Sequence, residues 1–215
     1  MKKSFLKVFA AVVFAAVATS CGSGLGKLAM DSPESVDKVK EIVITNVSPD
    51  EWKIIELSWS EGTGSGKLEN DLNNGSIFVK MVKKNGQVFT QPFIGELNWK
   101  SGKISPDSWY DNGLDFEKVV AVDATKLDAA TIMKQLEEAK KQIPAEYAFK
   151  SLAEYRIESD ITKSGDTYNP DLLTTFTVNV VEKGNETVSN AGSTSIVYYE
   201  IKFDVAPDGT VTMQE

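Results

Sequence analysis

The side chains that can do acid–base chemistry in this chain are carboxylates, because the sequence holds 31 acidic residues and no histidine. The absence of histidine excludes Ser-His-Asp and Cys-His catalysis and the ordinary histidine zinc sites. Glu56, Glu96, Asp111 and Asp115 can in principle supply an acid/base pair of the glycosidase kind, but no spacing singles out two of them. We therefore predict a protein that is not an enzyme and uses no cofactor and no metal, with a carboxylate-only hydrolase as an alternative.

Residues 107–115, D-S-W-Y-D-N-G-L-D, have the composition of a calcium loop, with three aspartates and an asparagine around Gly113. When Gly113 is set at position six of an EF-hand, Ser108 falls first and Tyr110 third, which are not the required ligands. The pattern favours a surface turn over a metal site.

Aromatic residues give a second kind of candidate site, because tryptophan and tyrosine rings stack on sugars and peptides. Trp59 alternates with Ile55 and Leu57 and is expected in the core. Trp99, Trp109 and Tyr110 lie beside turn residues and are the predicted ligand-binding residues. Packing in the core or at its rim is the alternative interpretation for these rings.

Cys21 is the only cysteine of the chain, so it cannot form an intramolecular disulfide. It follows a positive start (Lys2, Lys3 and Lys7), an apolar run at 8–18 and the small residues at 18–20, which is the pattern of a secretory signal peptide. The apolar run is shorter than the roughly 20 residues that a spanning helix needs.

The segment Ala18-Thr19-Ser20-Cys21 resembles the lipobox of bacterial lipoproteins, with Ala18 where common lipoboxes have leucine. Relaxed versions of this kind occur in Bacteroidetes-like bacteria. The resemblance implies cleavage before Cys21, diacylglycerol on its thiol and attachment to the membrane through acyl chains such as palmitate. Gly22 in place of aspartate, with no acidic cluster, favours an outer-membrane anchor facing the periplasm. An ordinary secreted protein with a free thiol is the alternative.

The predicted organisation is a signal peptide at 1–20, an anchor and Gly/Ser-rich tether at 21–30, and two halves at 31–122 and 123–215. Removal of residues 1–20, which hold three lysines and no acidic residue, leaves 20 basic and 31 acidic residues and a formal charge of −11. This charge argues against nucleic acid as a partner and suits a soluble domain in the cell envelope.

Hydrophobic periodicity predicts an α+β fold in which antiparallel meanders are each covered by a helix. In the first half we expect a helix at 35–43 that begins at Ser32-Pro33. Strands are expected at 53–60, 76–83 and 87–93, with Asn85-Gly86 as a hairpin turn. A short hairpin at 96–104 and a β-like run at 118–122 complete this half.

In the second half a helix is expected at 128–143, where Ile132, Leu136, Ala139 and Ile143 form one apolar stripe. Strands are expected at 152–161, 172–182, 195–205 and 210–214, with a polar loop at 184–193 and a tight turn at 207–209. The two halves share the order of helix, strand, loop, strand, turn and strand. An alignment of Gly86 with Gly209 brings their long strands into register.

The order of helix and meander, with I-P-A-E-Y-A-F-K-S-L-A-E-Y-R-I-E at 143–158 as the link, is similar to PepSY-like or BLIP-like periplasmic domains of lipoproteins. The resemblance covers about residues 125–215 and implies a binding or inhibitory module. The leading hypothesis is a lipid-anchored envelope protein that binds a protein or peptide. The runner-up is a carbohydrate-binding accessory lipoprotein.

Overall fold

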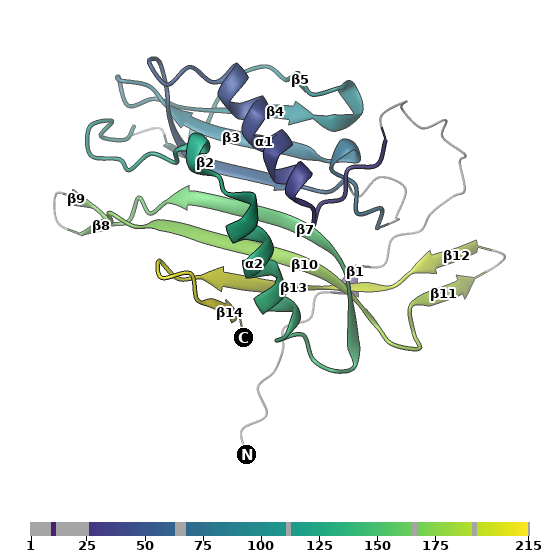
Figure 1. Ribbon diagram of the computed structural model, residues 1–215. Coiled ribbons are helices and arrows are strands. Elements are labelled where there is room, and N and C mark those ends of the chain that lie inside the picture. The colour runs from purple at the N-terminus through teal and green to yellow at the C-terminus, as the bar shows by residue number, and fades with distance from the viewer. Residues whose placement is uncertain are drawn as a thin grey trace.

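The computed structural model in Figure 1 has two helices on one side of a large antiparallel sheet, as the α+β prediction requires. The structure describes residues 10–11, 26–62, 68–110, 113–164, 167–190 and 193–214. The helices are α1, Pro33–Asn46, and α2, Ala129–Lys140. Short 3-10 turns lie at Leu72–Asn74, Gly95–Leu97, Ser108–Tyr110 and Ala124–Lys126.

Ten strands of the described chain form the main sheet, in the order β1-β13-β10-β7-β2-β3-β4-β5, with β14 beside β13 and β6 beside β4. Their bounds are β1 Ala10–Ala11, β2 Lys53–Ser60, β3 Ser76–Val82, β4 Val88–Ile94, β5 Lys100–Ser101, β6 Ser105–Pro106, β7 Tyr147–Ser159, β10 Leu172–Glu182, β13 Tyr198–Val205 and β14 Val211–Met213. Two small hairpins lie outside the main sheet: β8 Lys163–Ser164 with β9 Thr167–Tyr168, and β11 Thr187–Asn190 with β12 Ser193–Ile196.

The order of strands is symmetric about the pair β2 and β7, where Leu57 lies opposite Ile157. On one side follow β3 and β4, and on the other β10 and β13, so each half contributes a helix and three long strands. Gly86 therefore corresponds to the connection between β10 and β13, whereas Gly209 turns the chain into the extra strand β14. The alignment of Gly86 with Gly209 was wrong by one strand.

Both helices begin at a capping side chain. Ser32 Oγ accepts a hydrogen bond from Ser35 N at 3.3 Å, and Pro33 follows in the first turn. Asp128 caps α2 by accepting from Thr131 N at 3.1 Å. These are the residue types that satisfy the free N–H groups of a first helical turn. The buried side chains on each helix repeat every three or four residues, so one face packs on the sheet: Val36, Val39 and Val43 on α1; Ile132, Leu136 and Ala139 on α2.

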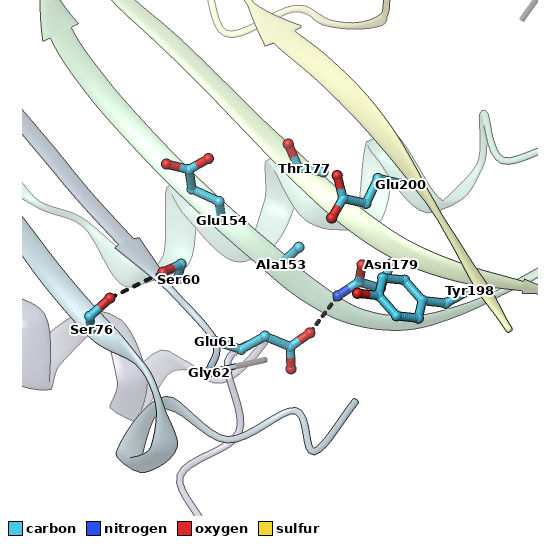
Figure 2. A pocket seen from close by; sticks show the side chains of 10 residues that line it. All are labelled: Ser60, Glu61, Gly62, Ser76, Ala153, Glu154, Thr177, Asn179, Tyr198 and Glu200. Carbon is cyan, nitrogen blue, oxygen red and sulfur yellow. Dashed lines mark hydrogen bonds between the residues drawn. The ribbon is translucent and has the colours of Figure 1, made fainter. Parts of the chain in front are cut away.

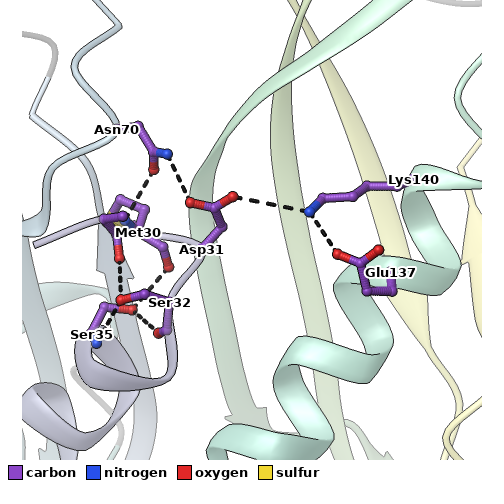
Figure 3. A network of polar contacts seen from close by, with 8 residues as sticks. Met30, Asp31, Ser32, Ser35, Asn70, Glu137 and Lys140 are labelled. Carbon is purple, nitrogen blue, oxygen red and sulfur yellow. Dashed lines mark hydrogen bonds and ion pairs between the residues drawn. The ribbon is translucent and has the colours of Figure 1, made fainter.

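A polar network fixes the start of α1 against α2 (Figure 3). Asn70 holds the turn before α1 by accepting from Met30 N at 3.0 Å and donating to Asp31 Oδ1 at 2.7 Å. Asp31 then reaches Lys140 on α2, with 4.0 Å between Oδ2 and Nζ. Lys140 also pairs with Glu137 at 2.7 Å. The two helices, one from each half, are thereby linked at one end.

The core between helices and sheet contains a ladder of stacked rings across four neighbouring strands. Trp59 on β2 stacks on Tyr155 of β7 with 4.8 Å between ring centroids. Tyr155 stacks on Phe176 of β10 at 5.7 Å, and Phe176 on Phe203 of β13 at 5.2 Å. Each ring is at most 3% exposed. The ladder crosses from one half to the other, so the halves share one hydrophobic core.

Tertiary packing moved several predicted bounds. Helix α1 extends to Asn46 instead of ending at Val43, because its β-branched Ile42 and Val43 lie on the buried face. Strand β7 begins at Tyr147, well before the predicted residue 152. Residues 118–122 form no strand. Val119 and Val122 are buried and Ala121 is exposed, while a single bond joins Val122 N to Ile54 O at 2.8 Å.

Two loop predictions were also wrong. Residues 184–193 contain one strand and the start of another, in the hairpin of β11 and β12, because Thr187, Val188 and Ser189 alternate well enough to pair with Ser195 and its neighbours. No separate hairpin forms at 96–104. Instead β5 returns directly onto β4, with Ser101 opposite Phe93.

Candidate functional site

The face of the sheet opposite the helices is polar and charged, and we call it the open face. Along each strand its side chains alternate with those of the core. Neither of the two α-helices of the described chain lies across it (Figure 1). Its central residues are Glu56, Ser58 and Ser60 on β2, Phe78 and Lys80 on β3, Glu154, Arg156 and Glu158 on β7, Thr175, Thr177 and Asn179 on β10, and Glu200 and Lys202 on β13.

A chain of ion pairs runs across the middle of the open face. Lys80 Nζ lies 2.8 Å from Glu56 Oε2 and 3.7 Å from Asp107 Oδ2. Arg156 lies 2.7 Å from Glu154 Oε1 and 3.8 Å from Glu56 Oε1. The side chains of Lys80, Glu56 and Asp107 are only 10–21% exposed. Charges that are linked and partly withdrawn from water hold a fixed orientation better than isolated surface pairs do.

Like charges lie next to one another in this network. Glu56 is directly opposite Glu158 in the pairing of β2 with β7. Burial raises the pKa of Glu158, and the nearby charge of Glu56 raises it further, whereas Arg156 and Lys80 act to lower it. Arg156 is the only arginine in the sequence. It therefore lies where its guanidinium offsets the repulsion among three glutamates.

The ion pairs form the floor of a hollow of about 520 Å³, which we call the central hollow. Two large apolar side chains also line it: Phe78, which is 46% exposed, and Trp109, which is 92% exposed. The Trp109 backbone is held by a bond from its N–H to Asp107 Oδ1 at 3.1 Å, and Asp107 belongs to the ion-pair chain. The most exposed large apolar side chain of the described residues thus borders the charged centre of the open face.

A second hollow, the end hollow, lies where β2 ends, and has a volume of about 360 Å³. In Figure 2 the Glu61 side chain points toward Asn179, and both residues line this hollow. Glu61 accepts hydrogen bonds from Ser151 Oγ at 2.5 Å, from Asn70 N at 2.9 Å and from Asn179 Nδ2. The Glu61 side chain is buried, and this burial raises its pKa. Tyr198 and Glu200 of β13 also line this hollow.

The structure separates the three aromatic residues that the sequence proposed as a ligand-binding set. Trp99 is 9% exposed and belongs to the hydrophobic core, so it offers no ring to a ligand. Trp109 is exposed and lines the central hollow. The Tyr110 side chain lies outside the described part of the structure. Trp52 and Trp59 are buried, in line with the alternative of core packing.

The candidate carboxylates that the structure describes lie on different elements, and part of the candidate calcium loop, residues 111–112, lies outside the described residues. Glu56 is on the open face, while Glu96 is exposed in the turn after β4 and Asp115 is an exposed partner of Lys118 at 3.3 Å. Asp111 lies outside the described residues. Within the described ranges no group of three or more histidine, cysteine, aspartate or glutamate side chains is placed to hold a metal ion.

Cys21, the rest of the tether up to residue 25 and the predicted signal, apart from Ala10 and Ala11, lie outside the described residues. Those two alanines pair with Tyr199 and Tyr198 as β1. In the part of the chain that the structure describes, neither helix is long and apolar enough to cross a membrane. Comparison of the chain with family models, with curated proteins and with solved structures finds no match.

Sequence reasoning missed the groups that make the open face distinctive: Lys80, Arg156, Glu61, Ser151 and Asn179. One signal was available, since Glu154, Arg156 and Glu158 alternate with the apolar Tyr155 and Ile157 and include the single arginine. No local pattern links Glu61 to Asn179, because their bond depends on the pairing of distant strands.

Proposed function

We propose that this chain is a lipid-anchored protein of the bacterial cell envelope whose open face binds a protein or peptide partner and catalyses no reaction. The observation that carries the proposal is that Trp109, which is 92% exposed, lies beside a half-buried chain of ion pairs. Exposed tryptophans next to arginine are typical of the few residues that dominate the affinity of protein interfaces.

The charge pattern supports a macromolecular partner with defined orientation. The charges along this line alternate in sign, with 2.7–3.8 Å between the charged atoms of successive residues. Their order is Asp107, Lys80, Glu56, Arg156 and Glu154. An alternating line of fixed charges favours a partner whose own charges are in register, and disfavours others through like-charge contacts. A hydrolase is less favoured, because each of these carboxylates is already paired with a cation.

The runner-up, carbohydrate binding, has less support. Burial of Trp99 leaves Trp109 as the one exposed ring among the described members of the proposed aromatic set. A glycan array probed with the protein and with Trp109→Ala tests this alternative. Saturable glycan binding that Trp109→Ala abolishes would favour a carbohydrate ligand over a protein.

Photo-crosslinking in intact cells tests the protein-binding proposal. A photoreactive amino acid replaces Thr90, which lines the central hollow, or Lys134, which is exposed on α2 on the opposite side. We expect discrete adducts with an envelope protein from position 90 and none from position 134. Adducts of equal yield at both positions, or none at position 90, would contradict the proposal.

The lipid anchor rests on the sequence pattern around Cys21. Fractionation of cells that produce the full chain or Cys21→Ala is expected to find the former in membranes and the latter in soluble fractions. Protease treatment of intact cells then reports orientation. Protection of the membrane-bound protein supports a periplasm-facing domain, and cleavage supports a domain on the cell surface.

A further inference from the structure

The two edges of the main sheet are covered in different ways. At one edge, β5 and β6 pair with the two ends of β4. Pro92 lies between them and has no N–H, and its carbonyl accepts a hydrogen bond from Gly102 N at 2.7 Å. At the other edge, β14 covers residues 203–205 of β13, and β1 covers Tyr198 and Tyr199. Part of this second edge is therefore covered by a strand from the predicted signal peptide.

The backbone of β13 presents hydrogen-bonding groups to the second edge at every other residue. Lys202 O accepts from Gln214 N at 2.9 Å on the outer side, whereas the pairing with β10, in constant register, lies on the inner side. Because these groups alternate between the two sides of a strand, the N–H and C=O groups of Glu200 and Tyr198 also point outward. Ala11 lies opposite Tyr198, so β1 occupies this outer position.

We propose that removal of residues 1–20 vacates the place of β1, and that an extended segment of the partner adds there as an antiparallel strand beside Tyr198 and Glu200. This inference rests on the proposed function, because it needs the cleavage that the lipid anchor implies and gives the form in which the peptide partner binds. Strand addition to a sheet edge is a general mode of peptide recognition, since a free edge offers unpaired N–H and C=O groups.

The two sides of β13 define the chemistry of the added segment. Tyr198 and Glu200 lie on the open face, where both line the end hollow, so the added strand continues the face that we propose for binding. Tyr199 lies on the helix side, partly buried against the core, with its ring 5.4 Å from that of Tyr147. The partner residue opposite Tyr199 should therefore be apolar. The segment needs free N–H groups, so it has no proline at the paired positions.

The test uses the chain as cells process it, purified in detergent from membranes of cells that produce the full-length sequence. Its intact mass is measured first, because a chain that keeps residues 1–20 would overturn the inference. The probe is a peptide of residues 8–13, V-F-A-A-V-V, between two pairs of lysines. We expect saturable protection of the Glu200 N–H from hydrogen exchange, followed by NMR, and no change at Ile201, whose N–H faces β10. Absence of protection at Glu200 would overturn the proposal.

Two controls show whether backbone groups carry the contact. A peptide with N-methyl groups on both alanines keeps every side chain and charge, and each register that pairs the six residues with both Tyr198 and Glu200 uses one of these alanines. Glu200→Pro removes the outward N–H of the protein, whereas Glu200→Ala removes only the side chain. We expect the N-methylated peptide and the Glu200→Pro protein each to bind about tenfold more weakly, read at the N–H of Tyr198. Equal affinities of the two peptides, or of Glu200→Pro and Glu200→Ala, would overturn the proposal.

A second copy of the chain is the alternative occupant of this edge. If the processed chain is a dimer that Glu200→Pro dissociates and Glu200→Ala does not, the assignment to a partner peptide is overturned.

The two proposals fail in different ways. If Trp109→Ala abolishes the adducts at position 90 while the peptide leaves Glu200 unprotected, the edge inference falls and the proposed function stands. If the adducts do not depend on Trp109, the proposed function falls whatever the peptide does. A chain that keeps residues 1–20 contradicts both the lipid anchor and the edge inference, and its mass identifies that case.

Discussion

Asn179 donates a hydrogen bond to the carboxylate of Glu61 although the two residues are 118 positions apart in the sequence. Glu61 follows the last residue of β2, and Asn179 lies on β10, so the bond joins the two halves on the open face. The stacked pair of Trp59 and Tyr155 joins the same halves on the core side. The two halves therefore form one structural unit, and both hollows lie on its open face.

The buried carboxylate of Glu61 links folding to pH. Because burial raises its pKa above the ordinary 4.5, the folded protein holds this proton at pH values where the unfolded chain has lost it. The free energy of unfolding therefore falls as pH rises from about 4.5 through the raised pKa. We predict that Glu61→Gln removes this fall, measured by urea unfolding of both proteins across that range. Parallel pH profiles would contradict the account.

Asp128 provides a control of opposite sign. Hydrogen bonds from the side chain and backbone of Thr131 lower its pKa below 3.8. The stability it contributes is present above the pKa of the unfolded chain and is lost as pH falls toward the folded value. Asp128→Asn should therefore flatten the pH profile below about pH 4, a range distinct from the one in which Glu61→Gln acts.

The aromatic ladder predicts that the two halves unfold together. Phe176 lies between Tyr155 and Phe203 and is 2% exposed. Phe176→Ala is expected to lower the free energy of unfolding by about 3–5 kcal/mol, as other deletions of buried rings do. Circular dichroism and the fluorescence of the tryptophans, all in the first half, should show one coincident transition. Two separate transitions would indicate that the halves are independent domains.

Two turn glycines offer a matched comparison of backbone strain. Gly86 and Gly209 both have positive φ, 82° and 86°, which costs a residue with a Cβ about 1 kcal/mol or more. A Cβ at Gly86 would also lie 2.6 Å from the backbone oxygen of Leu114, whereas one at Gly209 meets nothing within 4 Å. Gly86→Ala should therefore destabilise the protein more than Gly209→Ala, as measured by thermal unfolding. Equal effects would show that Leu114 moves aside freely.

The single arginine should control the ionisation of its neighbours. Arg156 lowers the pKa of Glu158, against burial and the charge of Glu56. Arg156→Gln is therefore expected to raise the pKa of Glu158 further, which NMR titration of the side-chain carboxyl can follow. Lys202→Gln, the loss of a more weakly acting cation, should raise it less. An unchanged pKa in Arg156→Gln would contradict the ion-pair arrangement.

Local patterns predicted the elements that have a clear apolar alternation or a clear apolar stripe. The bounds of β2 and β10 match the predictions, and the stripe of Ile132, Leu136 and Ala139 is buried on α2. Patterns failed where packing decided the outcome, as at residues 118–122, where Val119 and Val122 are buried without strand pairing. The α+β class follows from periodicity, but the mirrored order of strands follows from the pairing of β2 with β7.

The candidate site was less predictable than the fold. Exposure of Trp109 and burial of Trp99 cannot be read from their neighbours, since both tryptophans lie beside turn residues. The end hollow needs contacts between Glu61, Ser151 and Asn179, which come from three strands or strand ends. A sequence shows which residues are polar, whereas the register decides which of them meet.

The most direct test of the binding face compares Trp109→Ala with Leu97→Ala, a change at another exposed apolar residue, 58% exposed, that does not line the central hollow. Both substitutions should alter the free energy of unfolding by no more than about 0.5 kcal/mol, because both side chains are largely in solvent. The measurement is the yield of crosslinked envelope adduct from the photoreactive residue at position 90 in intact cells. The account predicts loss of most of the adduct in Trp109→Ala, in line with the roughly 2 kcal/mol or more of a dominant interface residue, and full yield in Leu97→Ala. Equal yields in the two variants would contradict a partner bound at this face.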